Sequence, residues 1–140
     1  MAIINKEYQD VLGINPKYKS IIGSLGPKAD EAFTTIVNLC ANSIIHYDEI
    51  RARGFEGSYT FGILKRKDGL FAPQIFNVAT LTYYGKVKIA GATMMKLVNL
   101  GLLIKKSRCY DKINIYSIPN DLFTTNDLSI KFYNPDISQF

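Results

Sequence analysis

The stretch IAGATMMKLVNLGLLIKKSRCYDKINIYSIP, residues 89–119, contains three successive signals of regular structure. Before Gly101, apolar side chains recur at helical spacing on one face of a predicted helix. They are Ala90, Met94, Leu97 and Leu100. Gly101 stands where a residue with positive φ ends a helix. Residues 102–104 and 112–118 then predict two β-strands joined by a basic turn.

This order resembles the recognition helix and wing of winged helix-turn-helix domains. In that superfamily a helix ends in Leu-x-x-x-Gly-Leu-Ile and a β-wing follows. Leu97, Gly101, Leu102 and Leu103 occupy those positions here. The resemblance implies an α+β fold with a three-helix core and a C-terminal β-wing, and the pattern of residues 58–76 adds a hairpin on the N-terminal side. Winged helices bind DNA in many families and serve as protein-interaction modules in others.

Two earlier segments are expected to supply the other core helices. From residue 28 to about 47, six apolar side chains fall on one helical stripe, and continuation toward Gly54 stays open. The stripe consists of Phe33, Ile36, Val37, Cys40, Ile44 and Tyr47. Residues 77–85 are expected to form the first helix of the helix-turn-helix. Thr80, Thr82 and the paired tyrosines make this segment a weak helix former.

The remaining segments give shorter predictions. Residues 58–76 alternate polar and apolar side chains around a basic turn, which predicts a β-hairpin. Asn120 and Asp121 predict the cap of a short helix. We therefore divide the chain into an N-terminal extension (1–27), a winged-helix domain (28–123) and a C-terminal tail (124–140).

Composition limits the class of protein. A chain of 140 residues with 47% hydrophobic residues predicts one domain with a packed core. It contains no apolar run long enough for a membrane span and no signal-peptide pattern at its start. Cys40 and Cys109 are far apart and predict no disulfide, so the expected location is a reducing cytoplasm. The many Ile, Asn and Lys residues suit a low-GC bacterium, its phage or a plasmid.

The sequence contains no recognisable catalytic constellation. Gly57 and Gly62 are not followed by the Lys-Ser/Thr of a phosphate-binding loop. His46 is the only histidine, and no Cys or His near it in sequence suggests a metal site. We expect no enzyme activity, no catalytic residue, no metal and no cofactor, although a site made of carboxylates stays open.

Positive charge is concentrated in the predicted helix-turn-helix and wing. Between Lys86 and Lys112 there are seven Lys or Arg residues and one acid, Asp111, which gives a net charge of +6. The whole chain carries +5, so the rest of it is slightly acidic. This asymmetry predicts one electropositive face.

The predicted nucleic-acid contacts come from this region. Gly91 and Ala92 are small enough for close approach to a major groove, and Thr93, Lys96 and Asn99 offer groups to base edges or phosphates. Predicted phosphate contacts are Lys86, Lys88, Lys105, Lys106, Arg108 and Lys112, with Lys65, Arg66 and Lys67 as additional candidates.

Two functions remain as alternatives. The first is a regulator or replication factor that binds double-stranded DNA. The second is a winged-helix adaptor or inhibitor that binds a partner protein, which Met95 on the expected exposed face favours because Met suits adaptable protein contacts. A homodimer also stays open, and salt-dependent binding to duplex DNA separates the two functions.

Overall fold

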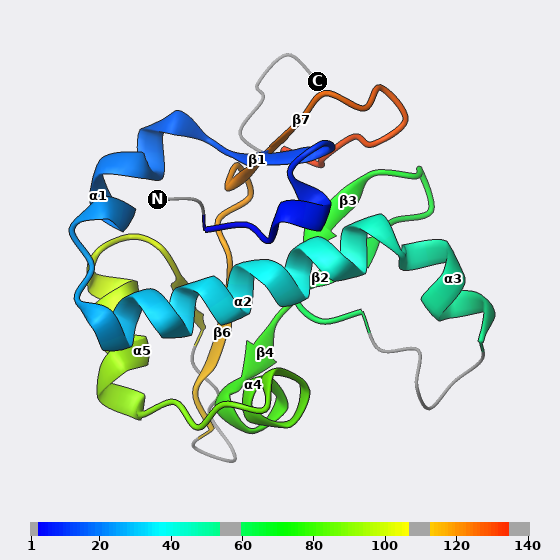
Figure 1. Ribbon diagram of the computed structural model, residues 1–140. Helices are drawn as coiled ribbons and strands as arrows, with labels where there is room; N and C mark the ends of the chain where they lie inside the picture. Colours follow the sequence, from blue (N-terminus) through cyan, green and yellow to red (C-terminus); the bar gives the residue numbers. More distant parts are fainter. Residues whose placement is uncertain (1–2, 54–59, 107–112, 135–140) are drawn as a thin grey trace.

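The computed structural model describes residues 3–53, 60–106 and 113–134, and it is a mixed α+β fold with small antiparallel sheets. Figure 1 shows helices α1 (Lys19–Gly23), α2 (Pro27–Ile45), α3 (Tyr47–Ala52), α4 (Val78–Gly85) and α5 (Gly91–Asn99), with 3₁₀ turns η1 (Lys6–Tyr8) and η2 (Pro16–Tyr18). The strands are β1 (Leu12–Ile14), β2 (Ile63–Lys65), β3 (Phe71–Pro73), β4 (Phe76–Asn77), β5 (Ile104–Lys106), β6 (Ile115–Ser117) and β7 (Phe123–Thr125). They pair in the orders β1–β7, β2–β3 and β4–β6–β5.

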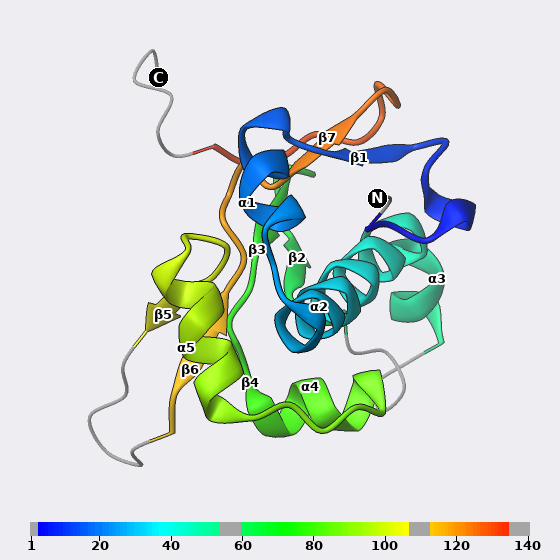
Figure 2. The same cartoon turned by 60° about the vertical axis from the view of Figure 1, so that its left-hand side comes forward.

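Helix α2 runs through the middle of the fold, and α3, α4, α5, η1 and β2 all contact it (Figure 2). All six side chains of the predicted stripe are buried, and Phe33, Ile36, Val37 and Cys40 have no exposed surface. The helix ends at Ile45, because His46 leaves helical geometry at φ −109° and ψ 21° and a separate helix, α3, follows. The predicted core helix is therefore confirmed, with a break before Tyr47.

Helix α4 forms although its residues are weak helix formers, because its start is capped. The Asn77 side chain accepts hydrogen bonds from the Thr80 backbone N–H and hydroxyl, each at 2.8 Å. Such a cap contributes about 1 kcal/mol to helix stability. A Cβ at Gly85 would lie 2.7 Å from Thr35 Cγ2, so this glycine lets α4 pack closely against α2.

Helix α5 ends as its sequence predicts. Gly101 has φ +82°, and the backbone N–H of Leu102 donates to Leu97 O at 3.0 Å. This is the arrangement of a glycine-terminated helix. Met94 and Leu97 have no exposed surface, and β5 and β6 form the predicted hairpin after the helix. The helix and the second strand are thus confirmed, whereas the first strand is Ile104–Lys106 rather than the expected 102–104 and includes two lysines that were expected in the turn.

The β2–β3 hairpin is shorter than predicted. Its turn passes through Gly69, which has φ +86°, and Ile63 pairs with Pro73. Phe76 was expected in the returning strand, but that expectation is wrong, because Phe76 pairs with Tyr116 of β6 in a different sheet. Proline has no backbone N–H to continue the ladder, which explains why β3 stops at Pro73.

Strands β1 and β7, which are far apart in sequence, pair with each other as antiparallel strands. Ile14 of β1 lies opposite Phe123 of β7. The predicted short helix after Pro119 is wrong, because Asn120 and Asp121 form a turn that leads into β7. The Asp121 backbone and side chain bind residues near β1 instead: Asn15 Nδ2 donates to Asp121 O at 3.0 Å, and the Asp121 carboxylate accepts from Tyr18 and Lys17.

We expect Leu97→Ala to lower the free energy of unfolding by about 2–5 kcal/mol, because it removes a fully buried side chain where α5 packs. Denaturant titration measures the change. Asn99→Ala, two residues away on the exposed side of the same helix, is the matched control and should change stability by less than about 0.5 kcal/mol. Equal losses in both variants would contradict the assigned helix face.

The Asp121 cluster predicts a pH dependence of stability. Partial burial raises the pKa of Asp121, but hydrogen bonds from Lys17 and Tyr18 and the Lys17 charge outweigh it, so this pKa lies below its usual 3.8. Burial, then the bond to Asp121, raises the pKa of Tyr18 from 10.0 to about 12. The stabilisation of the folded state by the Asp121 carboxylate is thus present above pH 3.8 and disappears as the pH falls through the lowered pKa. The stabilisation of the folded state by the neutral Tyr18 hydroxyl is complete below pH 10.0 and disappears as the pH rises through about 12.

Chemical denaturation across pH measures both effects. Asp121→Asn should flatten the acid limb of the stability curve below pH 3.8, and Tyr18→Phe should flatten the alkaline limb above pH 10.0. A curve for Asp121→Asn that runs parallel to the wild-type curve in acid would show that this carboxylate does not stabilise the fold.

Candidate nucleic-acid interface

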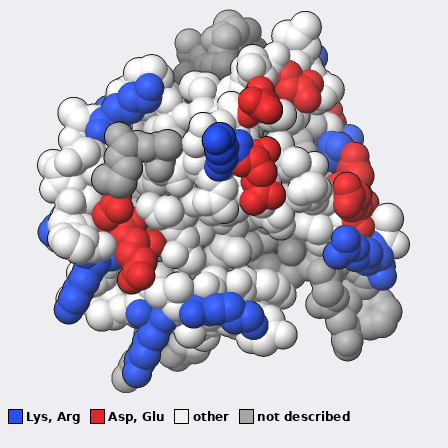
Figure 3. All heavy atoms as spheres, in the orientation of Figure 1, with Lys and Arg blue, Asp and Glu red and all other residues white. Residues whose placement is uncertain are grey.

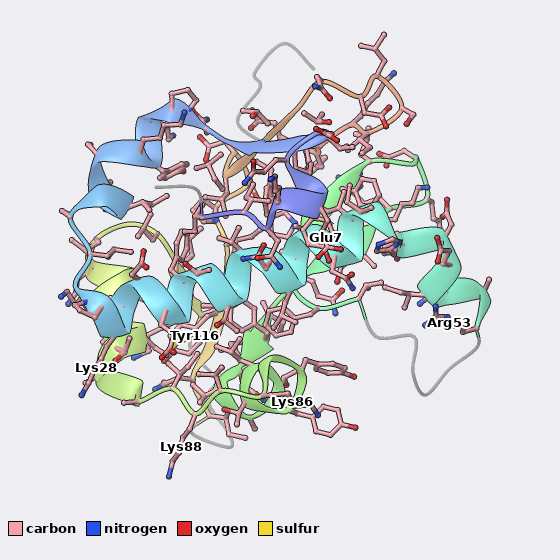
Figure 4. All side chains as sticks on the ribbon, in the orientation of Figure 1. Glu7, Lys28, Arg53, Lys86, Lys88 and Tyr116 are labelled. Atoms are coloured by element: carbon pink, nitrogen blue, oxygen red, sulfur yellow. The ribbon has the colours of Figure 1, made fainter. Side chains whose placement is uncertain are left out.

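The turn between α4 and α5 is fixed at both ends. Lys86 ends α4 in the left-handed region, with φ 55°, and its backbone N–H donates to Thr82 O at 2.9 Å. Ile89 is buried and anchors the other end of the turn. Lys86 and Lys88 are therefore held on the surface, and Figure 4 shows the Lys88 side chain projecting away from α2. The Lys86 ammonium lies 4.9 Å from the centre of the Tyr83 ring.

The predicted contact face of α5 is largely open to solvent. Gly91, Ala92, Lys96 and Asn99 are exposed, whereas Thr93 is half-buried. Met95, expected on the exposed face, is also half-buried. No side chain caps the start of α5, and Ala90 O accepts from the N–H groups of Thr93 and Met94. The helix thus presents small residues at its N-terminus and two polar side chains further along.

Lys28 joins this surface from a distant part of the sequence. It is exposed in the first turn of α2, and Lys96 Nζ lies within 3.8 Å of where a Cβ on Gly26 would stand. The start of α2 therefore adjoins α5. Figure 4 places Lys28, Lys86 and Lys88 along one edge of the molecule, and Figure 3 shows basic side chains along that same edge. The sequence pattern did not predict that Lys28 belongs to this surface, because only the packing of α2 on α5 brings Lys28 close to α5.

The strand register separates the two lysines of β5. Lys105 lies opposite Tyr116, which is buried in the core, and Lys106 lies opposite half-buried Ile115. Paired residues of an antiparallel sheet share a face, and neighbours along a strand alternate. Lys105 therefore lies on the same face of the sheet as Tyr116 and Lys106 on the opposite face, and both side chains are exposed. The phosphate contacts predicted for both lysines stay predictions, and Arg108 and Lys112 lie outside the described residues.

The basic tip of the β2–β3 hairpin is engaged within the protein. Lys65 Nζ lies 3.4 Å from Asp48 Oδ1, and Arg66 Nη2 lies 3.2 Å from Asp68 Oδ2. The Arg66 guanidinium also lies 3.8 Å from the centre of the Tyr133 ring. Lys67 is exposed. Figures 1 and 2 place this tip at a different end of the molecule from α5, so the structure does not join it to the α5 surface.

The described residues also bear on metal, membrane and thiol sites. Within residues 3–53, 60–106 and 113–134, no three His, Cys, Asp or Glu side chains lie close enough to hold a metal ion. Over those ranges, too, no helix has the length and apolar content needed to cross a membrane. Cys40 is fully buried, and burial raises the pKa of its thiol well above the usual value, which disfavours the reactive thiolate.

Comparison with known proteins adds no assignment to this geometry: no protein-family model, no curated protein and no solved structure matches the chain.

Proposed function

We propose that residues 27–118 form a winged helix-turn-helix unit that binds double-stranded DNA and performs no catalysis. The order of elements supports this proposal. Helix α2, strand β4, helices α4 and α5, and strands β5 and β6 occur in this order along the chain, with α3, β2 and β3 inserted between α2 and β4. Strand β6 lies between β4 and β5 in the sheet. Three helices in this order, followed by a C-terminal hairpin, are the elements that the resemblance implies, and their presence supports the proposal.

The observation that carries the DNA proposal is the exposed face of α5 together with the lysines around it. An α-helix fits the major groove of B-DNA, and small residues at its start allow close approach. Lys28, Lys86 and Lys88 come from segments that border α5, and Lys105 lies on the same face of the sheet as Tyr116. Lysines in such positions suit contacts with the phosphates on both sides of a groove.

The biological role that fits such a protein is a transcription regulator or replication factor of a low-GC bacterium, phage or plasmid. The chain carries a net charge of +5, which favours association with a polyanion. Lys96 and Asn99 provide the polar groups for base edges, so some preference among sequences is expected.

Salt-dependent binding tests the proposal, with Lys105 and Lys106 as a matched pair of variants. Fluorescence anisotropy with a labelled duplex should give a log affinity that falls by about 0.9 per phosphate contact for each tenfold rise in salt. Lys105→Gln should weaken binding and flatten this slope by about 0.9. Lys106→Gln removes the same charge from the opposite face of the sheet and should leave the slope unchanged. Equal effects of the two variants would contradict the proposed orientation of the hairpin.

Sequence preference provides a second, independent prediction. Asn99→Ala should change the ranking of a duplex library selected by the protein, because Asn99 is placed toward base edges. Lys88→Gln should weaken binding to all sequences by a similar factor, because a phosphate contact carries no sequence information. An unchanged ranking in Asn99→Ala would remove α5 from the readout of sequence.

Exposed apolar side chains favour the adaptor as the alternative function. Tyr83 is 66% exposed at the end of α4, and Ile104 is 44% exposed on β5. Aromatic residues are common at the centres of protein interfaces. If the wild-type protein shows no salt-dependent affinity for any duplex tighter than about 10⁻⁴ M, the weak end of non-specific binding, the DNA proposal is wrong. An acidic protein partner for the same surface would then be the function to test.

A further inference from the structure

A cavity of about 450 Å³ lies between the N-terminal segment, β1, α1 and the first turns of α2. Its apolar wall is made of aliphatic side chains: Ile3, Ile4, Leu12, Ile14 and Ile22. Each of them retains 3–9% exposure, whereas Phe33, Ile36 and Val37 on α2 have none. Cavities of this size and lining bind small molecules in many proteins.

Two opposite charges line the same cavity. Lys19, at the start of α1, is exposed, and Asp30, in the first turn of α2, is half-buried. In the part of the chain that the structure describes, neither side chain has an ion pair, and they do not pair with each other. The third polar lining residue is already engaged, because Gln9 Nε2 donates to Ile4 O at 2.8 Å. Among the described residues, a ligand for this cavity therefore meets a cation and an anion without an ion-pair partner and an aliphatic wall.

We propose that the cavity binds a small zwitterion with an aliphatic side chain, either a free amino acid such as leucine or a short aliphatic peptide. The ligand carboxylate pairs with the Lys19 ammonium, the ligand ammonium pairs with the Asp30 carboxylate, and the aliphatic side chain lies against the isoleucines. Charge-assisted contacts at both ends fix the orientation of the ligand, and apolar contact adds affinity. This proposal is independent of DNA binding, because its readout is ligand affinity.

Ligands with a single charge fit the lining less well. A fatty acid would satisfy Lys19 but would leave Asp30 beside an apolar chain, and an aliphatic amine would do the reverse. Desolvating a charge without a partner is unfavourable. A nucleotide would place phosphates close to the Asp30 carboxylate with only Lys19 to neutralise them.

Isothermal titration calorimetry with leucine and with Leu-Leu tests the proposal on the full chain. Leucinamide lacks the carboxylate, N-acetyl-leucine lacks the ammonium, and glycine lacks the aliphatic side chain, so each should bind at least about tenfold more weakly than leucine. Lys19→Gln and Asp30→Asn should each weaken leucine binding to a similar extent.

Matched variants separate the site from general effects of charge. Lys28→Gln and Glu31→Gln remove the same charges from exposed positions of α2 outside the cavity wall and should leave leucine affinity unchanged. Gly23→Leu adds a side chain to the wall at a position where an added Cβ meets no atom within 4 Å. This variant should keep the wild-type melting temperature and lose leucine binding.

Three results would overturn the proposal. One is the lack of saturable leucine or Leu-Leu binding with a Kd below about 1 mM in the folded wild-type protein. Another is octanoate binding as tight as leucine binding and insensitive to Asp30→Asn, which would make the cavity a site for aliphatic acids. The last is full leucine affinity in a folded Gly23→Leu variant, which would place the bound leucine elsewhere.

Discussion

The burial of the apolar stripe of α2 is the constraint on which the rest of the structure depends. Phe33, Ile36, Val37 and Cys40 have no exposed surface, and burying a large aliphatic or aromatic side chain contributes roughly 1.5–3 kcal/mol. Helices α4 and α5 and strand β2 supply the surfaces that cover this stripe. The exposed face of α5 follows from this packing, because Met94 and Leu97 must face inward and Asn99 then faces solvent.

The local elements of the fold could be predicted because each depends on residues close together in sequence. The stripe of α2, the inward face of α5 and the positive φ of Gly101 follow from helical spacing and from the conformational freedom of glycine. The cap at Asn77 is also a local signal, and it explains why α4 forms from weak helix formers. The pairings β4–β6 and β1–β7 join segments that are distant in sequence, and no local pattern identifies the partner of a short strand.

For the candidate site, too, the residues that depend on local sequence were predicted, and those that depend on long-range packing were not. The sequence predicted Lys96 and Asn99 of α5 and the lysines of the adjoining turn, which are exposed, whereas Thr93 is half-buried. The prediction missed Lys28, which reaches the site only through packing of α2 on α5. It also grouped Lys105 with Lys106, although the register with Tyr116 and Ile115 puts them on opposite faces. Whether the predicted extension, domain and tail behave as separate units stays a prediction, while β1 and β7 tie the outer two together.

The central claim is that α5 and the lysines beside it form the surface that receives duplex DNA. Backbone amide shifts from a ¹⁵N-labelled protein titrated with a short duplex test it most directly. The account predicts the largest shifts in residues 86–99 and at Lys105, with little change at the β2–β3 tip around Lys67. Shifts centred on that tip, or none at all at low salt, would contradict the assignment of this surface.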